Sequence, residues 1–462
     1  MLKKVLTLLS GSLLFTACTV SKQWNSKQTQ QSWEATFQDF SGNEKLKFPP
    51  HKDHILYLNA KLATTSGSLQ LFANEKRLTH PNPVSHHKLD LKNKLLIKLA
   101  GNHAKGSFRL NYPQFTKKNI EVRYNSNIEL LALSYVLANY DDFTGFSDDQ
   151  SFEINGQPVK VKALYALTTK IANTFKSFLK SENLKVIKTY FDKDFYAHYA
   201  NFVMSLPDFP NATVEKDNRF MKSFSSLSDA QRFTAAFNSF FLEINFQKFL
   251  VDFKPYYETV QKEIKLNMPA SNFIVEMENL FGKEVEHYVL YPSLTMPFSS
   301  GFAVGSQNTI GNIFASTNQP KEVDDIKQLK LGFDNSLSLR TIAVHEFGHA
   351  FVNPAIDLVD EKIISASAPL FEPIKKQMSE QGYNQWKICL YEHFNRANEV
   401  MIARLLGDKL KADEILKDNV DKRFYRYLPQ IVDQLEFWYN NEFLDKSYAQ
   451  KAAEIITELK SK

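Results

Sequence analysis

The chain has 462 residues, of which 43% are hydrophobic and 13% aromatic, and its formal net charge is +5. This composition can form a sizeable core, and the length predicts two to three domains. No cluster of Lys and Arg interleaved with aromatic residues is present, so nucleic acid is not an expected partner.

The N-terminal sequence MLKKVLTLLSGSLLFTAC contains two lysines, an apolar stretch and small residues directly before Cys18. This pattern resembles a bacterial lipoprotein signal peptide over residues 1–17, with Cys18 lipidated as the first mature residue. It predicts a cell-envelope protein that the lipid anchors to a membrane, at the periplasmic face or the outer-membrane surface. The alternative is a plain secretory signal that leaves Cys18 as a thiol.

The only other cysteine in the sequence is Cys389. If Cys18 carries lipid, no pair remains for an intramolecular disulfide, and an exported protein must then depend on its core for stability. Cys389 lies among apolar residues and is expected to be a small buried side chain.

The N-terminal part of the chain is expected to be β-rich. Residues 18–40 are rich in Gln, Ser, Lys and Thr, which predicts a flexible tether. Short apolar runs broken by glycines follow, such as HILYLNAKLATTSGSLQLFAN, and these are typical of strands. We expect a small β-sandwich-like domain over residues 41–115.

Residues 116–462 have a different pattern. Apolar residues recur at helical spacing in segments such as SNIELLALSYVLANYDD, and a strand-like interval covers residues 285–316. The expected fold class is therefore α+β: a β-sandwich-like N-terminal domain, then a mostly helical domain with a small sheet.

The segment DNSLSLRTIAVHEFGHAFVNP predicts a helix capped by Asn335 or Ser336 and ended by Asn353 and Pro354. It is apolar almost all round, so we expect it to be buried. Gly348 in its interior costs about 1 kcal/mol relative to Ala, which suggests that another element packs closely there.

Within this helix His345 and His349 are four residues apart, so their imidazoles project from one face, one turn apart. Two such nitrogens can enter one tetrahedral zinc shell, and the adjacent Glu346 can take a proton from an attacking water. The alternative is a core helix with hydrogen-bonded histidines, but burying these groups without a partner is costly. We expect one zinc ion per chain, with Glu346 as the general base.

Catalytic zinc normally has three protein ligands, and the segment WKICLYEHFNRANEVMIARL is the best source of the third. Glu392 and Glu399 lie on its polar stripe, and His393 lies nearer its apolar stripe. Glu392 and Arg396 also have the spacing of an exposed helical ion pair. The residues alone therefore leave the third ligand open.

These two segments, with SNIELLALSYVLANYDD and TYFDKDFYAHYANF upstream, resemble uncharacterised zinc-peptidase-like lipoproteins of Bacteroidetes. Those proteins form a domain of unknown function in the broad gluzincin group. The resemblance covers roughly residues 120–440 and implies a zincin-like (gluzincin) domain with an HExxH active-site helix. It favours Glu392 over Glu399 as the third zinc ligand. It also implies that an edge strand within residues 285–316 holds the substrate backbone.

Tyr425, Tyr427 and Tyr439 near the C-terminus are candidate hydrogen-bond donors to an oxyanion. The expected function is zinc-dependent hydrolysis of peptide bonds in a peptide or protein substrate. Two alternatives stay open: a binding or adhesion lipoprotein with a structural or lost metal site, and a zinc hydrolase of a non-peptide amide.

Overall fold

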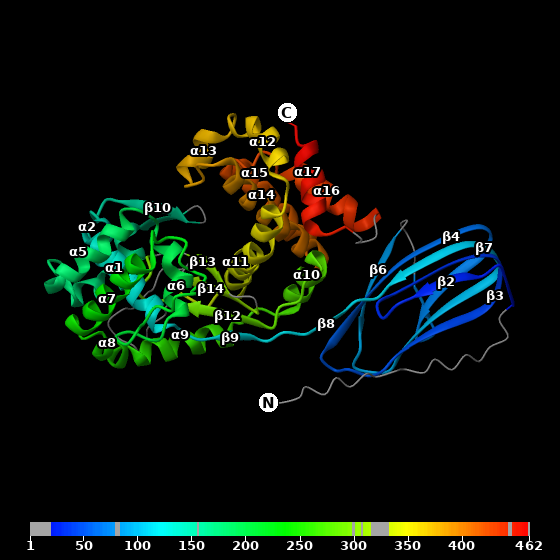
Figure 1. Cartoon of the computed structure of the whole chain (residues 1–462), viewed down its shortest axis with the longest axis horizontal. Coiled ribbons are helices and arrows are strands. Elements are labelled where there is room, and N and C mark those ends of the chain that lie inside the picture. The colour runs from blue at the N-terminus through cyan, green and yellow to red at the C-terminus, as the bar shows by residue number, and fades with distance from the viewer. Residues whose placement is uncertain are drawn as a thin grey trace. The chain divides into compact units, whose positions relative to one another are not determined.

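The computed structural model describes residues 20–78, 84–154, 157–297, 301–305, 308–315, 332–441 and 446–460. The predicted signal peptide and Cys18 lie outside these residues. The chain forms two compact units, which are drawn in Figure 1. Unit 1 comprises the residues up to Lys117 and Leu435–Lys446, and unit 2 comprises Lys118–Gln434 and the residues from Ser447 onward.

Unit 1 contains an antiparallel sheet with three long central strands, β3 (Ser32–Phe48), β7 (Leu95–Asn111) and β4 (His54–Ala73), in that order. The shorter strands are β1 (Val20–Lys22), β2 (Asn25–Gln28), β5 (Lys76–Arg77), β6 (Ser85–Asp90) and β8 (Gln114–Thr116). The pairing register shifts near the middle of β3 and of β4, and both halves of each strand contribute to one apolar core. Among the described residues, hydrogen bonds join all these strands into one sheet, where a sandwich of two was expected.

The sheet begins earlier in the chain than predicted. Most of the predicted tether, residues 18–40, lies in β1, β2 and the first half of β3. In β3 the buried Trp33, Ala35 and Phe37 alternate with exposed polar residues. A strand with one solvated face can have the average composition of a polar linker, which is why composition alone suggested a tether.

Unit 2 contains a small sheet with the strand order β13 (Gly301–Gly305), β14 (Thr309–Phe314), β12 (His287–Pro292) and β9 (Ile120–Val122). β13 is antiparallel to β14, whereas the other pairs are parallel. Three of these strands lie in the interval predicted from the sequence. A separate hairpin joins β10 (Ser151–Ile154) and β11 (Gln157–Lys160).

Helices make up most of unit 2, and in Figure 1 most of the earlier helices lie on one side of the small sheet, with α11 and α10 on the other. The earlier helices are α1 (Ser126–Ala138), α2 (Tyr140–Thr144), α3 (Val161–Leu164), α4 (Ala166–Thr174), α5 (Glu182–Phe191), α6 (Ala200–Ser205), α7 (Leu227–Glu243), α8 (Phe246–Asp252), α9 (Lys254–Leu266) and α10 (Asn272–Phe281). The later helices are α11 (Ser336–Asp357), α12 (Glu361–Ser367), α13 (Lys375–Glu380), α14 (Trp386–Leu405), α15 (Lys409–Arg423), α16 (Leu428–Asn441) and α17 (Tyr448–Glu458). Among the described helices, none combines the length with the apolar composition that a membrane span requires.

A buried carboxylate fixes the loop that follows β12 and leads toward β13. Glu129 of α1 accepts hydrogen bonds from the Tyr257 hydroxyl at 2.7 Å and from the main-chain amides of Leu294 and Thr295, both at 3.2 Å. Because these donors come from α9 and the loop, they tie both segments to α1.

Candidate metal centre

Helix α11 carries the HEFGH motif and begins as predicted, because the side chain of Asn335 accepts a hydrogen bond from the Ser338 amide at 2.9 Å. Its end was predicted wrongly: the helix continues through Pro354 to Asp357. Proline lacks the main-chain N–H that would donate one of the helical hydrogen bonds. The helical turn after Pro354 is nevertheless held in place, because the side chain of Ile356 is fully buried.

Helices α11 and α14 approach closely at Gly348. A Cβ atom on this residue would lie 2.1 Å from Asn395 Oδ1 and 2.8 Å from Asn398 Nδ2. No side chain fits in that space, so the prediction of close packing at Gly348 is confirmed. This contact brings the polar stripe of α14 to the histidine face of α11.

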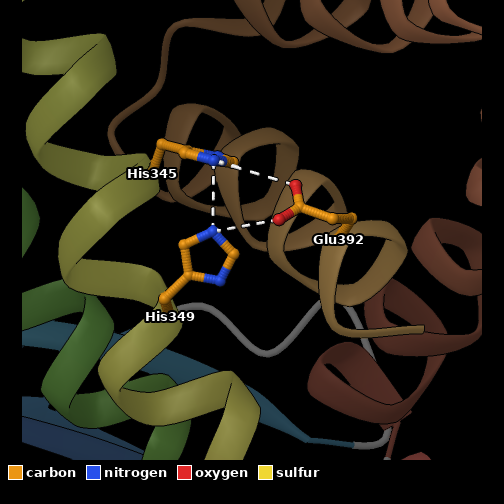
Figure 2. A group of neighbouring side chains, drawn as sticks. All are labelled: His345, His349 and Glu392. Carbon is orange, nitrogen blue, oxygen red and sulfur yellow. Dashed lines mark hydrogen bonds and ion pairs between the residues drawn. The ribbon is translucent and has the colours of Figure 1, made fainter. Parts of the chain in front are cut away.

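The close packing brings Glu392 of α14 together with His345 and His349 of α11, as Figure 2 shows. The two Nε2 atoms are 3.2 Å apart, and Glu392 Oε1 lies 3.3 Å from His349 Nε2. Glu392 Oε2 lies 3.8 Å from His345 Nε2. Ligands of a tetrahedral zinc ion, each about 2.0–2.2 Å from the metal, are separated by about 3.3 Å. The three side chains therefore have a spacing that could accept a tetrahedrally coordinated metal ion.

The partners of the histidines indicate which nitrogens carry protons. His345 Nδ1 lies 2.6 Å from Glu399 Oε1, and His349 Nδ1 lies 3.2 Å from Asn353 Oδ1. Because a carboxylate and an amide oxygen accept hydrogen bonds, each Nδ1 is assigned as the donor. Both Nε2 atoms then present lone pairs to each other and to the Glu392 carboxylate. Such an arrangement is repulsive unless a cation or a proton lies between the three groups, and a metal ion fits it.

Glu399 supports His345 from the side away from Glu392. It is 3% exposed and accepts a hydrogen bond from Arg396 Nη1 at 2.7 Å. Burial alone would raise the pKa of Glu399, but Arg396 and His345 together bring it below its usual value. Arg396 thus forms its ion pair with Glu399, and Glu392 is buried at 8% exposure, so the alternative of an exposed Glu392–Arg396 pair does not fit this structure.

Burial also controls the charge of His349. It lowers the pKa of this imidazole to about 4, and the neighbouring His345 adds to the effect. His349 is therefore neutral at neutral pH in the metal-free protein. A neutral imidazole is the form that binds a metal ion.

Glu346 points toward the small sheet. A Cβ atom placed on Gly301, the first residue of β13, would lie 3.4 Å from Glu346 Oε1. Burial raises the pKa of Glu346 to about 7; His345 opposes this shift, and Glu392 and Glu399 add to it. A carboxylate with this pKa can both accept and release a proton near neutral pH.

The remaining candidate on α14, His393, lies away from the cluster. It is fully buried, its Nδ1 lies 2.8 Å from the carbonyl oxygen of Cys389, and its ring packs 4.9 Å from that of Tyr425. Cys389 is also fully buried, as expected.

The tyrosine candidates are separated by the structure. The Tyr427 hydroxyl donates to the Leu370 carbonyl at 2.6 Å, and Tyr439 belongs to unit 1, where its ring stacks on that of His86. Of the three, Tyr425 is affected by the charge of the cluster. Burial raises the pKa of Tyr425 most, and the negative charge of Glu392 raises it further.

Sequence reasoning missed the contacts of two residues near the cluster. Tyr383, in the turn before α14, forms a hydrogen bond with Tyr425, and its pKa is raised by burial and by Glu392. A single tyrosine in a polar turn gives no periodic signal. Asn353 was considered only as part of the helix end, although its spacing of four residues from His349 places both side chains on one face of the helix.

The fold and the site define unit 2 as an α+β domain with a buried His–His–Glu cluster that could hold a metal ion. The chain belongs to the family described as Domain of unknown function (DUF4932), which matches residues 120–457 and so includes both helices of the cluster. Nothing among curated proteins or solved structures matches the chain. The family description gives no activity, metal or location.

Proposed function

We propose that this protein is a zinc-dependent peptidase in which His345, His349 and Glu392 hold one zinc ion per chain. The observation that carries the proposal is the convergence of two imidazole lone pairs and a carboxylate at tetrahedral spacing. Three protein ligands leave one position for water or substrate, which is typical of catalytic zinc, whereas structural sites usually have four.

Glu346 is the proposed general base. When bound, zinc supplies Lewis-acid activation of water and of the substrate carbonyl. The Glu346 carboxylate takes the proton of the attacking water and delivers it to the leaving nitrogen. In the metal-free protein burial raises the pKa of Glu346, which makes its carboxylate a stronger base.

The substrate chemistry follows from β13. Within the part of the chain that the structure describes, this strand has β14 on one side and no strand on the other. An extended peptide can add to such an edge through main-chain hydrogen bonds. Gly301 has no side chain between this edge and Glu346, so a bound peptide bond can come close to the base. These features favour a peptide over a non-peptide amide.

The deciding measurement is the zinc content of the purified protein. We expect about one zinc per chain by elemental analysis, and we expect His345→Ala and His349→Ala each to lose it. His287→Ala, which changes an exposed histidine of unit 2, is the matched control and should keep the metal. Full zinc occupancy in either site variant would contradict the proposed site.

We also propose that the protein acts at the cell envelope, anchored by lipid on Cys18. The support is the N-terminal sequence, in which Cys18 directly follows the small residues of a cleavage site. Cys18→Ser should move the protein from the membrane fraction to the soluble envelope fraction. Identical fractionation of the variant and the wild type would overturn the lipid anchor but leave the peptidase proposal intact.

A further inference from the structure

The outer edge of β13 is partly occupied by a side chain from another element. The main-chain N–H of Gly305, at the end of the strand, donates a hydrogen bond to Asn201 Oδ1 at 2.8 Å. Asn201 lies on α6. The bond therefore runs from the edge of the sheet to a helix, on the side of β13 opposite β14.

This bond shows which other residues of β13 face outward. In an antiparallel strand, successive residues direct their N–H and C=O groups alternately to the two sides. Because the Gly305 amide points away from β14, the main-chain groups of Ala303 and Gly301 point away from β14 as well. Gly301 is the residue beside Glu346, and Gly305 is at the far end of the strand.

We propose that Asn201 is a specificity-determining residue that ends the substrate-binding edge. This inference rests on the proposed function. A peptide that pairs with β13 can use the outward groups of Gly301 and Ala303, but Asn201 already occupies the position at Gly305. The substrate class is therefore an extended peptide. On one side of its scissile bond, the main chain of β13 pairs with only a short stretch of the peptide.

The direction of the peptide decides which side is short. If it runs antiparallel to β13, the residues that reach toward Gly305 are those on the N-terminal side of the scissile bond. Additional residues on that side then gain no main-chain hydrogen bonds from β13. Extension in the other direction leads away from Asn201 and is not limited by it.

The test uses the zinc-loaded full chain with Glu346→Gln, which is expected to bind peptides without cleaving them. Affinity is measured for fluorescent peptides that are lengthened one residue at a time from either end. With Asn201 present, lengthening toward Gly305 should stop improving affinity once Gly301 and Ala303 are paired. With Asn201→Ala added, the next residue should improve affinity by about twofold to tenfold, the value of one or two main-chain hydrogen bonds.

Asn201→Asp is the matched control because it keeps an acceptor oxygen for the Gly305 amide, so its length dependence should equal that of the wild-type residue. If Asn201→Ala also shows that same dependence, Asn201 does not set the limit and the inference fails. If zinc is bound but no peptide binds to the Glu346→Gln chain and the wild-type chain cleaves none, the proposed function itself fails. The two failures therefore give different results.

Discussion

The sheet of unit 1 and the α11–α14 pair of unit 2 bury different kinds of side chain. The core of the sheet is formed by apolar residues such as Phe40, Leu58 and Leu99, and within the described residues of unit 1 the buried polar side chains are Asn59 and Ser85. The helix pair buries a dense set of polar groups instead: Glu346, Glu392, His393, Asn395, Asn398 and Glu399.

This difference has an energetic meaning. Burying apolar surface stabilises a fold, whereas burying polar groups costs free energy unless each finds a partner. Glu392 Oε2, Asn398 Oδ1 and Asn398 Nδ2 make no hydrogen bond in the described structure. We infer that, in the metal-free state, the contact between α11 and α14 stabilises the fold less than an apolar contact would, because it contains the polar groups of a metal-binding cluster. Substitutions in the sheet should then affect stability, and substitutions in the helix pair should affect zinc and catalysis.

Glu346→Gln is expected to separate catalysis from stability most strongly. The amide keeps the size of the side chain but cannot accept the proton of the attacking water, so hydrolysis should fall by about 10²–10⁴-fold or more. Zinc content and melting temperature should stay near those of the wild type. Peptide-library digestion with matched zinc analysis measures both. Activity within a few-fold of wild type would move the base to another residue.

Phe40→Ala is expected to have the opposite effect, lowering stability without changing zinc binding. The ring is fully buried and lies 5.2 Å from that of Trp24 and 5.5 Å from that of Phe37. Its loss should lower the free energy of unfolding of unit 1 by about 3–5 kcal/mol. Zinc affinity should not change. Hydrogen exchange along β3 and β7 would show where stability is lost. A loss of zinc affinity in the same variant would show that the stability of the sheet and zinc binding are not independent.

The sequence predicted different parts of the molecule unequally. The HEFGH motif is local, so helical geometry alone places His345 and His349 together, and the mixed fold class is confirmed in its coarse form. Glu392 and Glu399 lie on the same face of α14, so the choice between them depends on how α14 is positioned lengthwise against α11, and no local pattern contains that information. The strands in the predicted tether were missed because the average composition of that segment hides the alternation of buried and exposed residues.

A substitution at the helix contact should affect stability and zinc together. In Gly348→Ala the new methyl group would overlap Asn395 Oδ1, so α14 must move and take Glu392 with it. We expect a loss of about 1–3 kcal/mol in stability, with weaker zinc binding. The double variant Gly348→Ala/Asn395→Ala should cost less than the sum of its parts, because the overlapping atom is gone. A more stable Gly348→Ala variant, as helix propensity alone predicts, would contradict the close contact.

The finest comparison is between two glutamates of the same helix. If Glu392 is a zinc ligand, Glu392→Ala should weaken zinc binding at least tenfold. If Glu399 orients His345, Glu399→Ala should weaken it by about 10–100-fold. Zinc affinity alone therefore does not distinguish the two roles, but the stability of the metal-free protein does.

Removing Glu399 leaves the largely buried Arg396 without its carboxylate partner, so the melting temperature of the chelator-treated variant should fall, by the equivalent of about 3–5 kcal/mol. Removing Glu392 takes away a buried carboxylate that has an oxygen without a hydrogen bond, so the same temperature should stay constant or rise. Glu399→Gln is the control, because it keeps an acceptor for His345 and should lose less zinc affinity than Glu399→Ala. A fall in metal-free stability for Glu392→Ala as large as that for Glu399→Ala would mean that Glu392 is structural, and the third ligand would then have to be sought elsewhere.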